Sequence, residues 1–240
     1  MSVSLPAGQR VYAVGDIHGM HDLLITMLRL IEDDLDAQPP EGDVVEVFLG
    51  DYVDRGPHSR AVIDTLMAPP ASGQRVCLMG NHEDAMLSAL HDQAALMRWL
   101  SFGGDETCLS YGLDEAAVRH EPQALQTLLH TVVPPEHQAF LSGLLTHYQV
   151  GGVYFAHAGI RPGVPLGQQD RRDLLWIRDE FLSHPGPHPA HVVHGHTPVD
   201  APDHRTWRTN IDTAAVFGGP LTAAVLENGS VRFLCAHREV

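Results

Sequence analysis

The sequence predicts a protein of the α/β class, and three observations support this prediction. Short runs of β-branched apolar residues alternate with segments of helical periodicity through the N-terminal part of the chain. Beyond Val150 the pattern changes to a succession of short strands. The chain has 240 residues, enough to bury a sizeable core, and shows no repeat or boundary, so we expect one domain over residues 1–240.

The alternating part predicts three pairs of a strand and a helix. In the first helix, Leu23, Met27 and Leu30 recur at helical spacing. The acidic run over residues 32–36 is expected to be a solvated helix end that frays, because negative charge is unfavourable at a helix C-terminus. The pairs are strand 10–14 with helix 21–31, strand 44–49 with helix 59–67, and strand 75–79 with helical material over 83–100.

The C-terminal part predicts one more helix followed by strands. Pro134 and Pro135 favour a helix over residues 136–145, because proline suits the first helical turn. Asn228 and Gly229 form a hairpin signal between the last two strands. The expected strands cover residues 152–156, 190–193, 207–211, 221–227 and 231–235.

Three histidines alternate with prolines just before one of these strands. His184, His188 and His191 could form a metal site, but proline between them makes the backbone irregular. We interpret the segment as a stiff surface connection.

Five short polar clusters occur in order along the chain, and three of them directly follow a predicted strand. The carboxyl ends of strands are where open α/β sheets place ligands. Carboxylate and amide oxygens mixed with imidazole suit Mn²⁺, Fe or Zn²⁺ better than a thiolate zinc site or an all-oxygen calcium cage would. The clusters are Gly-Asp-Ile-His-Gly at 15–19, Gly-Asp-Tyr-Val-Asp-Arg-Gly at 50–56, Gly-Asn-His-Glu at 80–83, His-Ala-Gly at 157–159 and His-Gly-His-Thr-Pro at 194–198.

The first three clusters resemble the motifs of the phosphoprotein phosphatase superfamily of binuclear metallophosphoesterases. The last two, with Ile-Asp-Thr at 211–213, are similar to the bacterial and phage branch, the lambda phosphatase-like serine/threonine protein phosphatases. Ala214 stands where that branch tends to have glycine. The resemblance covers residues 11 to about 226. It implies a calcineurin-like sandwich of two mixed β-sheets flanked by helices, and we interpret residues 86–145 as a small helical cap.

The resemblance implies two divalent metal ions, with manganese as our first choice and iron or zinc as alternatives. A hydroxide bridging the two ions would be the nucleophile, since a bound divalent ion can lower the pKa of water from about 15.7 to about 7. His194 competes for the last ligand position, but we favour His196 because of its Gly-His-Thr-Pro context. One ion would be held by Asp16, His18 and Asp51, and the other by Asp51, Asn81, His157 and His196.

The same resemblance suggests the catalytic pair. His82 is our general acid for the leaving alkoxide, and Asp54 is its orienting partner. Asp54 could instead cap the helix that begins near Pro57.

Three arginines, together with Asn81, are candidates for binding the substrate phosphate. Arg55 is placed to grip it in a bidentate manner, with Asn81 beside it. The resemblance implies that Arg178 is a second phosphate-gripping arginine. Arg178 could instead pair with a neighbouring acidic residue, Asp179 or Glu180. Arg161 is a weaker third arginine.

We therefore expect a metal-dependent phosphomonoesterase, first of all a Ser/Thr protein phosphatase. Alternatives are a nucleotide pyrophosphohydrolase like the diadenosine tetraphosphatases, a phosphodiesterase, or a non-catalytic metal-binding module. Symmetrical diadenosine tetraphosphatases usually carry Gln and Asp where His18 and Glu83 stand, which favours the protein phosphatase. Within the cap, residues 99–105 could shape the substrate entrance, but we favour Trp99 and Phe102 as anchors of the cap to the core.

The amino-acid composition limits the classes of binding partner that we expect. Fifteen basic against 30 acidic residues give a formal charge of −15, which disfavours nucleic acid and anionic membranes as partners. Three scattered cysteines fit reduced thiols, and no membrane span or signal segment is visible. We expect a cytoplasmic monomer or small homo-oligomer that acts on a phosphoprotein or a small phosphorylated substrate.

Overall fold

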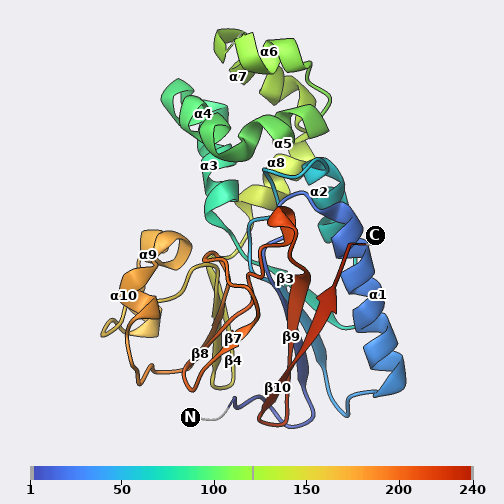
Figure 1. Cartoon of the computed structure of the whole chain (residues 1–240), viewed down its shortest axis with the longest axis vertical. Helices are drawn as coiled ribbons and strands as arrows, with labels where there is room; N and C mark the ends of the chain where they lie inside the picture. Colours follow the sequence, from blue (N-terminus) through green and yellow to red (C-terminus); the bar gives the residue numbers. More distant parts are fainter. Residues whose placement is uncertain (1–2, 121, 239–240) are drawn as a thin grey trace.

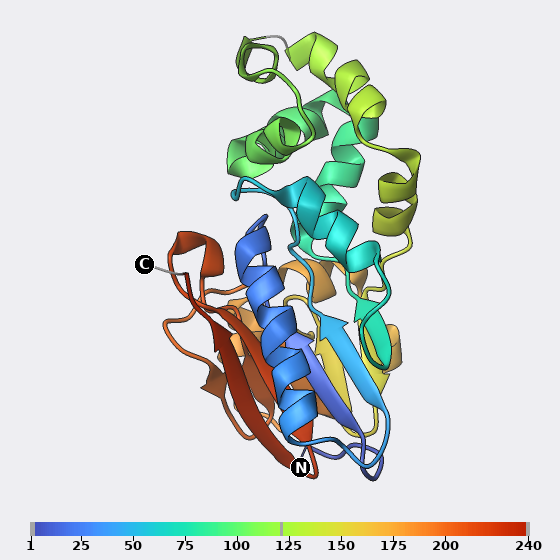
Figure 2. The same cartoon turned by 90° about the vertical axis from the view of Figure 1, so that its right-hand side faces the viewer.

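The computed structural model describes residues 3–120 and 122–238, and it confirms the predicted fold class. Two five-stranded sheets form the lower part of the molecule, and helices flank them (Figures 1 and 2). A group of helices rises above one end of the sheets.

The first sheet contains the three strands that precede the first three polar clusters. Strands β1, β2 and β3 are parallel, and β9 and β10 complete the sheet as antiparallel neighbours. Val14 pairs with Phe48, and Phe48 pairs with Cys77, so the three parallel strands end at one edge. The loops after them therefore emerge together. In the order β10-β9-β1-β2-β3, the bounds are Ser230–Ala236, Leu221–Glu227, Arg10–Val14, Val44–Phe48 and Gln74–Cys77.

The second sheet supplies the fourth and fifth clusters. Strands β5, β6 and β8 are parallel, while β4 and β7 are antiparallel edge strands. His157 follows the end of β5, and His196 follows the end of β6. In the order β4-β5-β6-β8-β7, the bounds are His147–Val150, Val153–Ala156, His191–His194, Arg208–Asn210 and Asp203–His204.

Alternating side chains of β1 divide the hydrophobic core. Val11 and Ala13 belong to the cluster between the sheets, which also contains Phe155 of the second sheet. Tyr12 and Val14 belong to the other large cluster, under helix α1 (His21–Ala37). The far face of the second sheet is covered by α9 (Arg171–Trp176) and α10 (Asp179–Leu182).

The helical cap begins inside the site. Helix α3 (Asn81–His91) starts at the third polar cluster and runs upward into the cap (Figure 1). The remaining cap elements are α4 (Gln93–Trp99), a π-helical turn η1 (Leu100–Gly104), α5 (Asp105–Ser110), α6 (Glu115–His120), α7 (Pro122–Val132) and α8 (Pro135–Ser142). Helix α2 (Ser59–Met67) lies beneath them and contacts α5 and α8.

Two expectations about helix ends were wrong, and strands β4 and β7 (Asp203–His204) were not predicted. Helix α1 does not fray at its acidic run but continues to Ala37, because the Asp34 carboxylate accepts a hydrogen bond from Tyr12 and pairs with Arg10. Strand β4 was not predicted, and α8 ends before it, at Ser142. Its burial pattern alternates between exposed and half-buried positions, so it lacks the apolar run by which other strands were recognised.

The interpretation of the histidine–proline segment as a surface connection was also wrong for two of its histidines. His188 and His191 are buried, and the His188 ring lies 5.2 Å from that of Phe181. None of the three-residue metal-ligating groups within the described residues includes either of them.

Two observations concern membranes and thiols. No helix in the described part of the chain has both the length and the apolar character to cross a membrane. Cys77, Cys108 and Cys235 are free thiols.

Candidate metal centre and active site

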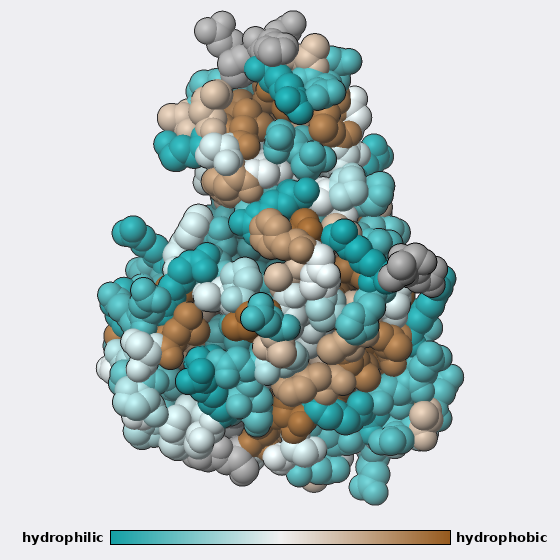
Figure 3. Space-filling view, viewed as in Figure 1, coloured by the Kyte–Doolittle hydropathy of each residue, from teal (hydrophilic) through white to brown (hydrophobic). Residues whose placement is uncertain are grey.

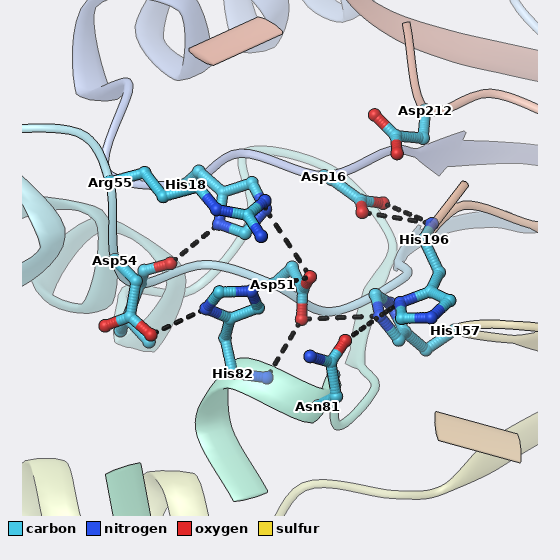
Figure 4. A network of polar contacts seen from close by, with 12 residues as sticks. Asp16, His18, Asp51, Asp54, Arg55, Asn81, His82, His157, His196 and Asp212 are labelled. Carbon is cyan, nitrogen blue, oxygen red and sulfur yellow. Dashed lines mark hydrogen bonds and ion pairs between the residues drawn. The ribbon is translucent and has the colours of Figure 1, made fainter. Parts of the chain in front are cut away.

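The five polar clusters meet above the carboxyl ends of the strands. Figure 4 shows side chains from the loops after β1, β2, β5 and β6 converging with the N-terminus of α3. Nearly all of these side chains are buried; Asp16, His18, Asp51, Asn81, His82, His157 and His196 are each no more than 5% exposed. Burial of so many polar groups is costly unless they share partners or bind an ion.

The loops that carry the site hold an unusual backbone conformation. His18, Asp51 and His196 have φ values of 45°, 53° and 65°. Asp54 and Arg55 follow with 75° and 69°. A residue with a side chain rarely adopts this left-handed conformation, which costs about 1–3 kcal/mol for each residue. Such strain persists only where the surrounding structure imposes it, and here it turns the side chains toward one another.

His157 presents an unprotonated ring nitrogen to a group of possible metal-ligand atoms. Its Nδ1–H donates to the Leu49 carbonyl at 3.1 Å, and burial lowers the pKa of the ring to about 3, so Nε2 carries no proton at neutral pH. Around Nε2 lie Asn81 Oδ1 at 3.0 Å and His196 Nδ1 at 3.1 Å. Asp51 Oδ1 follows at 3.3 Å. Oxygen and imidazole nitrogen atoms therefore gather within 3.3 Å of His157 Nε2, and a divalent cation would satisfy them all.

Asp51 also belongs to a second group of this kind. Its Oδ2 lies 3.5 Å from His18 Nε2 and 3.8 Å from His82 Nε2. His18 donates from Nδ1 to the Val53 carbonyl, and burial lowers its pKa, so its Nε2 is also a lone pair. In the structure the Arg55 guanidinium supplies positive charge there, at 2.7 Å. The two groups of three possible ligands, His18–Asp51–His82 and Asp51–His157–His196, share only Asp51.

Asp16 lies beside these groups, and its carboxylate is turned toward the backbone N–H of His196, at 3.0 Å (Figure 4). Gly195 has to be glycine here, because a Cβ would overlap the Asp16 carboxylate. Burial, Asp212 and Asp51 raise the pKa of Asp16. A bound cation would relieve this crowding of negative charge. The residues present therefore fit two divalent ions, and the assignment of Asp16 and Asn81 as ligands stays a prediction.

His82 and Asp54 form the shortest contact of the site. The ring Nδ1 donates to Asp54 Oδ2 at 2.6 Å, which leaves Nε2 directed toward Asp51. Asp54 also accepts hydrogen bonds from Trp99 at 2.8 Å and from Thr107 at 2.7 Å. It does not cap helix α2, whose N-cap is His58, so that alternative is wrong. Trp99 is more than an anchor, since its indole N–H reaches the proposed catalytic pair.

Glu83 is a site residue whose role the sequence did not reveal. Its buried carboxylate accepts hydrogen bonds from the backbone N–H groups of Asp51, Tyr52, Val53 and Gly80. It thereby holds the strained loop that presents Asp51. Burial and the Asp51 charge raise the pKa of Glu83 to about 8, while the backbone donors act in the opposite direction. A glutamate three residues after Gly80 is the sequence signal, because a carboxylate at the third helical position can accept a hydrogen bond from the backbone N–H of the residue that precedes the helix, as Glu83 does here at 2.8 Å.

The three arginines differ in their contacts. Arg55 contacts His18 and lies over the ring of Phe217, 5.5 Å from its centroid. Arg178 donates to Thr197 at 3.1 Å and forms no ion pair among the described residues, so pairing with Asp179 or Glu180 does not occur. Arg161 forms ion pairs with Asp173 and Glu180, which leaves it poorly placed for phosphate. The role of Arg55 and Arg178 in phosphate binding stays a prediction.

His194 and His196 point to different environments. The His194 ring packs on Phe181 at 5.0 Å and belongs to neither group of possible ligands among the described residues. His196 is in such a group. The geometry therefore agrees with the preference for His196.

Comparison with known proteins decides the family. The sequence matches the calcineurin-like phosphoesterase family over residues 9–238. The chain belongs to this family. It is therefore a metallophosphoesterase, whose relatives depend on a binuclear metal centre.

Relatives in the family carry different functional names. The asymmetrical bis(5'-nucleosyl)-tetraphosphatase PrpE of Anoxybacillus flavithermus is 29% identical, over 88% of this chain and 87% of its own. Serine/threonine-protein phosphatase 1 of Salmonella typhimurium is also 29% identical, over 91% and 93% of the two chains. The cold-active protein-tyrosine phosphatase of a Shewanella species shares the fold, with a TM-score of 0.61 at 17% identity over 98% and 84% of the two chains. Membership thus establishes the phosphoesterase chemistry and leaves the substrate to be inferred.

Proposed function

We propose that this protein hydrolyses phosphate esters and anhydrides at the convergence of the five polar clusters, with His82 as the general acid. The observation that carries the proposal is the sharing of Asp51 between two groups of possible metal ligands, one of which contains a histidine oriented by a buried carboxylate. Two divalent ions, with manganese as first choice, would supply an activated water and neutralise the phosphate charge.

The residues of the chain divide the remaining work. His18, Asp51, Asn81, His157 and His196, with Asp16, would hold the ions. Arg55 and Arg178 would bind the phosphoryl oxygens, since guanidinium groups match their geometry and charge. Asp54 fixes the His82 tautomer, so that Nε2 faces the reacting centre.

Proton transfer by His82 depends on the bound substrate. Burial lowers the pKa of His82 to about 4, with Asp51 acting to raise it and Arg55 to lower it. In the free protein the ring is thus neutral at pH 7. The negative charge of a bound phosphate next to Nε2 favours the protonated ring, which then donates its proton to the leaving oxygen.

Two substrate classes are supported. A phosphoserine or phosphothreonine protein is supported by the Salmonella relative and by His18 and Glu83 in the motifs. A dinucleoside polyphosphate is supported by the PrpE relatives. The motif differences at His18 and Glu83 concern symmetrical tetraphosphatases, whereas these relatives are named asymmetrical, so the motifs do not argue against this substrate class.

The test is turnover of a phosphothreonine peptide, diadenosine tetraphosphate and inorganic tripolyphosphate with Mn²⁺, Zn²⁺ or chelator. His82→Asn should lower kcat by about 10²–10⁴-fold while metal content stays the same. Tyr148, half-buried on strand β4, provides a matched control as Tyr148→Phe. No turnover of any substrate by the metal-loaded protein would refute the proposal. Full activity of His82→Asn would refute the role of His82.

A further inference from the structure

We infer that a cavity between the cap and helix α9 binds a nucleobase of the leaving group, which makes a nucleotide polyphosphate the substrate class. This inference rests on the proposed function, because it assigns a leaving group to the His82 side of the reaction. The cavity has a volume of about 270 Å³ and is lined by α3, α4, the π-helical turn and Trp176. Figure 3 shows that the molecule narrows between the cap and the sheets, the two parts from which the lining residues come.

Two aromatic rings join this cavity to the site. Phe102 stands edge-on to the His82 ring, with centroids 4.9 Å apart. Trp176 stands edge-on to the His196 ring at 6.0 Å. One wall thus abuts the proposed acid and the other abuts a candidate metal ligand. A group attached to the oxygen that His82 protonates would then lie along Phe102, on the side of the cavity.

The lining has the chemistry of a site for a planar heterocycle. Phe102 and Trp176 provide aromatic surface, and Ala85 and Ala95 leave space beside them. Arg98, Ser88 and Asp84 add donors and acceptors at the edge. A nucleobase offers both an aromatic face for stacking and hydrogen-bonding edges, whereas a serine or threonine side chain offers no ring.

Trp176 is exposed, and its helix is fixed to the cap; both features favour a role in ligand binding. The side chain is 45% exposed, although it is one of the largest apolar groups of a strongly acidic protein. An ion pair between Arg171 of α9 and Asp84 of α3, at 2.7 Å, ties its helix to the cap. The ring is therefore held at the mouth of the cavity, available for stacking. The volume of about 270 Å³ lies just below the range of about 300–1,000 Å³ for small-molecule sites and suits one base better than an extended peptide.

The experiment compares substrates with and without a base. Diadenosine tetraphosphate and inorganic tripolyphosphate both contain phosphoanhydride bonds, but only the first carries adenine. We compare the kcat/KM for diadenosine tetraphosphate divided by the kcat/KM for tripolyphosphate. Trp176→Ala should lower this ratio about tenfold or more, mainly through a higher KM for the nucleotide, because loss of stacking weakens binding of a base. Trp176→Phe should restore most of the ratio. Met97→Ala, an exposed apolar truncation on α4 outside the cavity lining, is the control.

A binding measurement separates this inference from the proposed function. Calorimetric titration with AMP in chelator requires no turnover, and Trp176→Ala should weaken binding about tenfold. No AMP binding to the wild type, or an equal ratio of kcat/KM values in wild type and Trp176→Ala, would overturn the inference. A Trp176→Ala defect confined to a phosphotyrosine peptide would also overturn it, because the cavity would then hold a phenol ring. If no substrate is hydrolysed but AMP binds through Trp176, the proposed function fails and the base site stands.

Discussion

Trp99 of the cap donates its indole N–H to Asp54 at 2.8 Å, on the same carboxylate oxygen that accepts the His82 ring N–H. The cap and the proposed acid pair are therefore one hydrogen-bonded unit. Both Trp99 and Asp54 are fully buried, so no solvent can replace the bond. Cap sequence should influence the catalytic step even where it does not touch substrate.

Trp99→Phe tests this connection. The substitution keeps an aromatic ring but removes the donor, and hydrogen bonds to charged groups contribute about 1.5–3 kcal/mol. We expect the free energy of unfolding, measured by urea titration, to fall by about this amount. The kcat should also fall, and the metal content should change little. Trp207→Phe, at a ring that lies against Gly186, is the matched control and should leave kcat unchanged. If kcat is unaltered in Trp99→Phe, the hydrogen bond between the cap and Asp54 does not contribute to catalysis.

Asp54→Asn should impair catalysis without emptying the metal centre. An amide in this position can offer its N–H₂ group to the ring, which favours the wrong tautomer of His82. We expect kcat to fall about 10²-fold or more, within the range for loss of general acid catalysis. Metal analysis of the purified variant should match wild type. Metal loss in step with activity would instead indicate a structural role for Asp54.

Glu83→Gln should be among the most disruptive conservative substitutions in the site. Four backbone N–H groups point at the two carboxylate oxygens, and glutamine replaces one of those oxygens by a donor. Each buried donor left without an acceptor costs about 1–3 kcal/mol. We expect a marked loss of stability to urea and weaker metal retention on dialysis, because the Asp51 loop relaxes. Wild-type stability of this variant would contradict the role assigned to Glu83.

Ala214→Gly should stabilise the protein. Ala214 has φ 59° and ψ 42°, a left-handed conformation that costs a residue with a Cβ about 1–2 kcal/mol. Glycine adopts it freely, although its greater freedom in the unfolded chain offsets part of the gain. A rise of about 0.5–1 kcal/mol in the free energy of unfolding is expected from urea titration. A decrease would show that the alanine methyl group makes a compensating contact.

Acidification should destabilise the fold through His191. This residue is 1% exposed, and burial lowers its pKa to about 4, below the value of 6.5 in the unfolded chain. Between pH 6.5 and 4 the unfolded chain binds a proton that the folded protein does not, so stability is full above that window and falls as pH decreases through it. The loss is roughly 3 kcal/mol at most, at about 1.4 kcal/mol for each pH unit. Urea titrations of metal-free protein at pH 7 and pH 5 measure it, and His191→Gln should reduce the difference. If His191→Gln shows the same difference in stability between pH 7 and pH 5 as the wild type, other buried histidines cause the effect.

The sequence by itself determined eight of the ten strands, the helices that follow β1, β2 and β3, and the order of the five clusters. Apolar runs with β-branched residues locate β1, β2 and β9, because buried strands consist mainly of such residues. Proposed ligands such as Asp51 could be named because short motifs keep their residues adjacent in the chain. Strand β4 escaped because its half-exposed pattern carries little apolar signal.

Only the tertiary structure decided which side chains meet across long separations. Trp99 reaches Asp54 over 45 positions, and Asn81 reaches His157 over 76. The same is true of Glu83, whose four backbone partners come from two loops, and of the cavity between Phe102 and Trp176. Such contacts depend on how the cap and the two sheets pack against one another. Local propensity and motif spacing do not contain that information, because packing is a property of the whole fold.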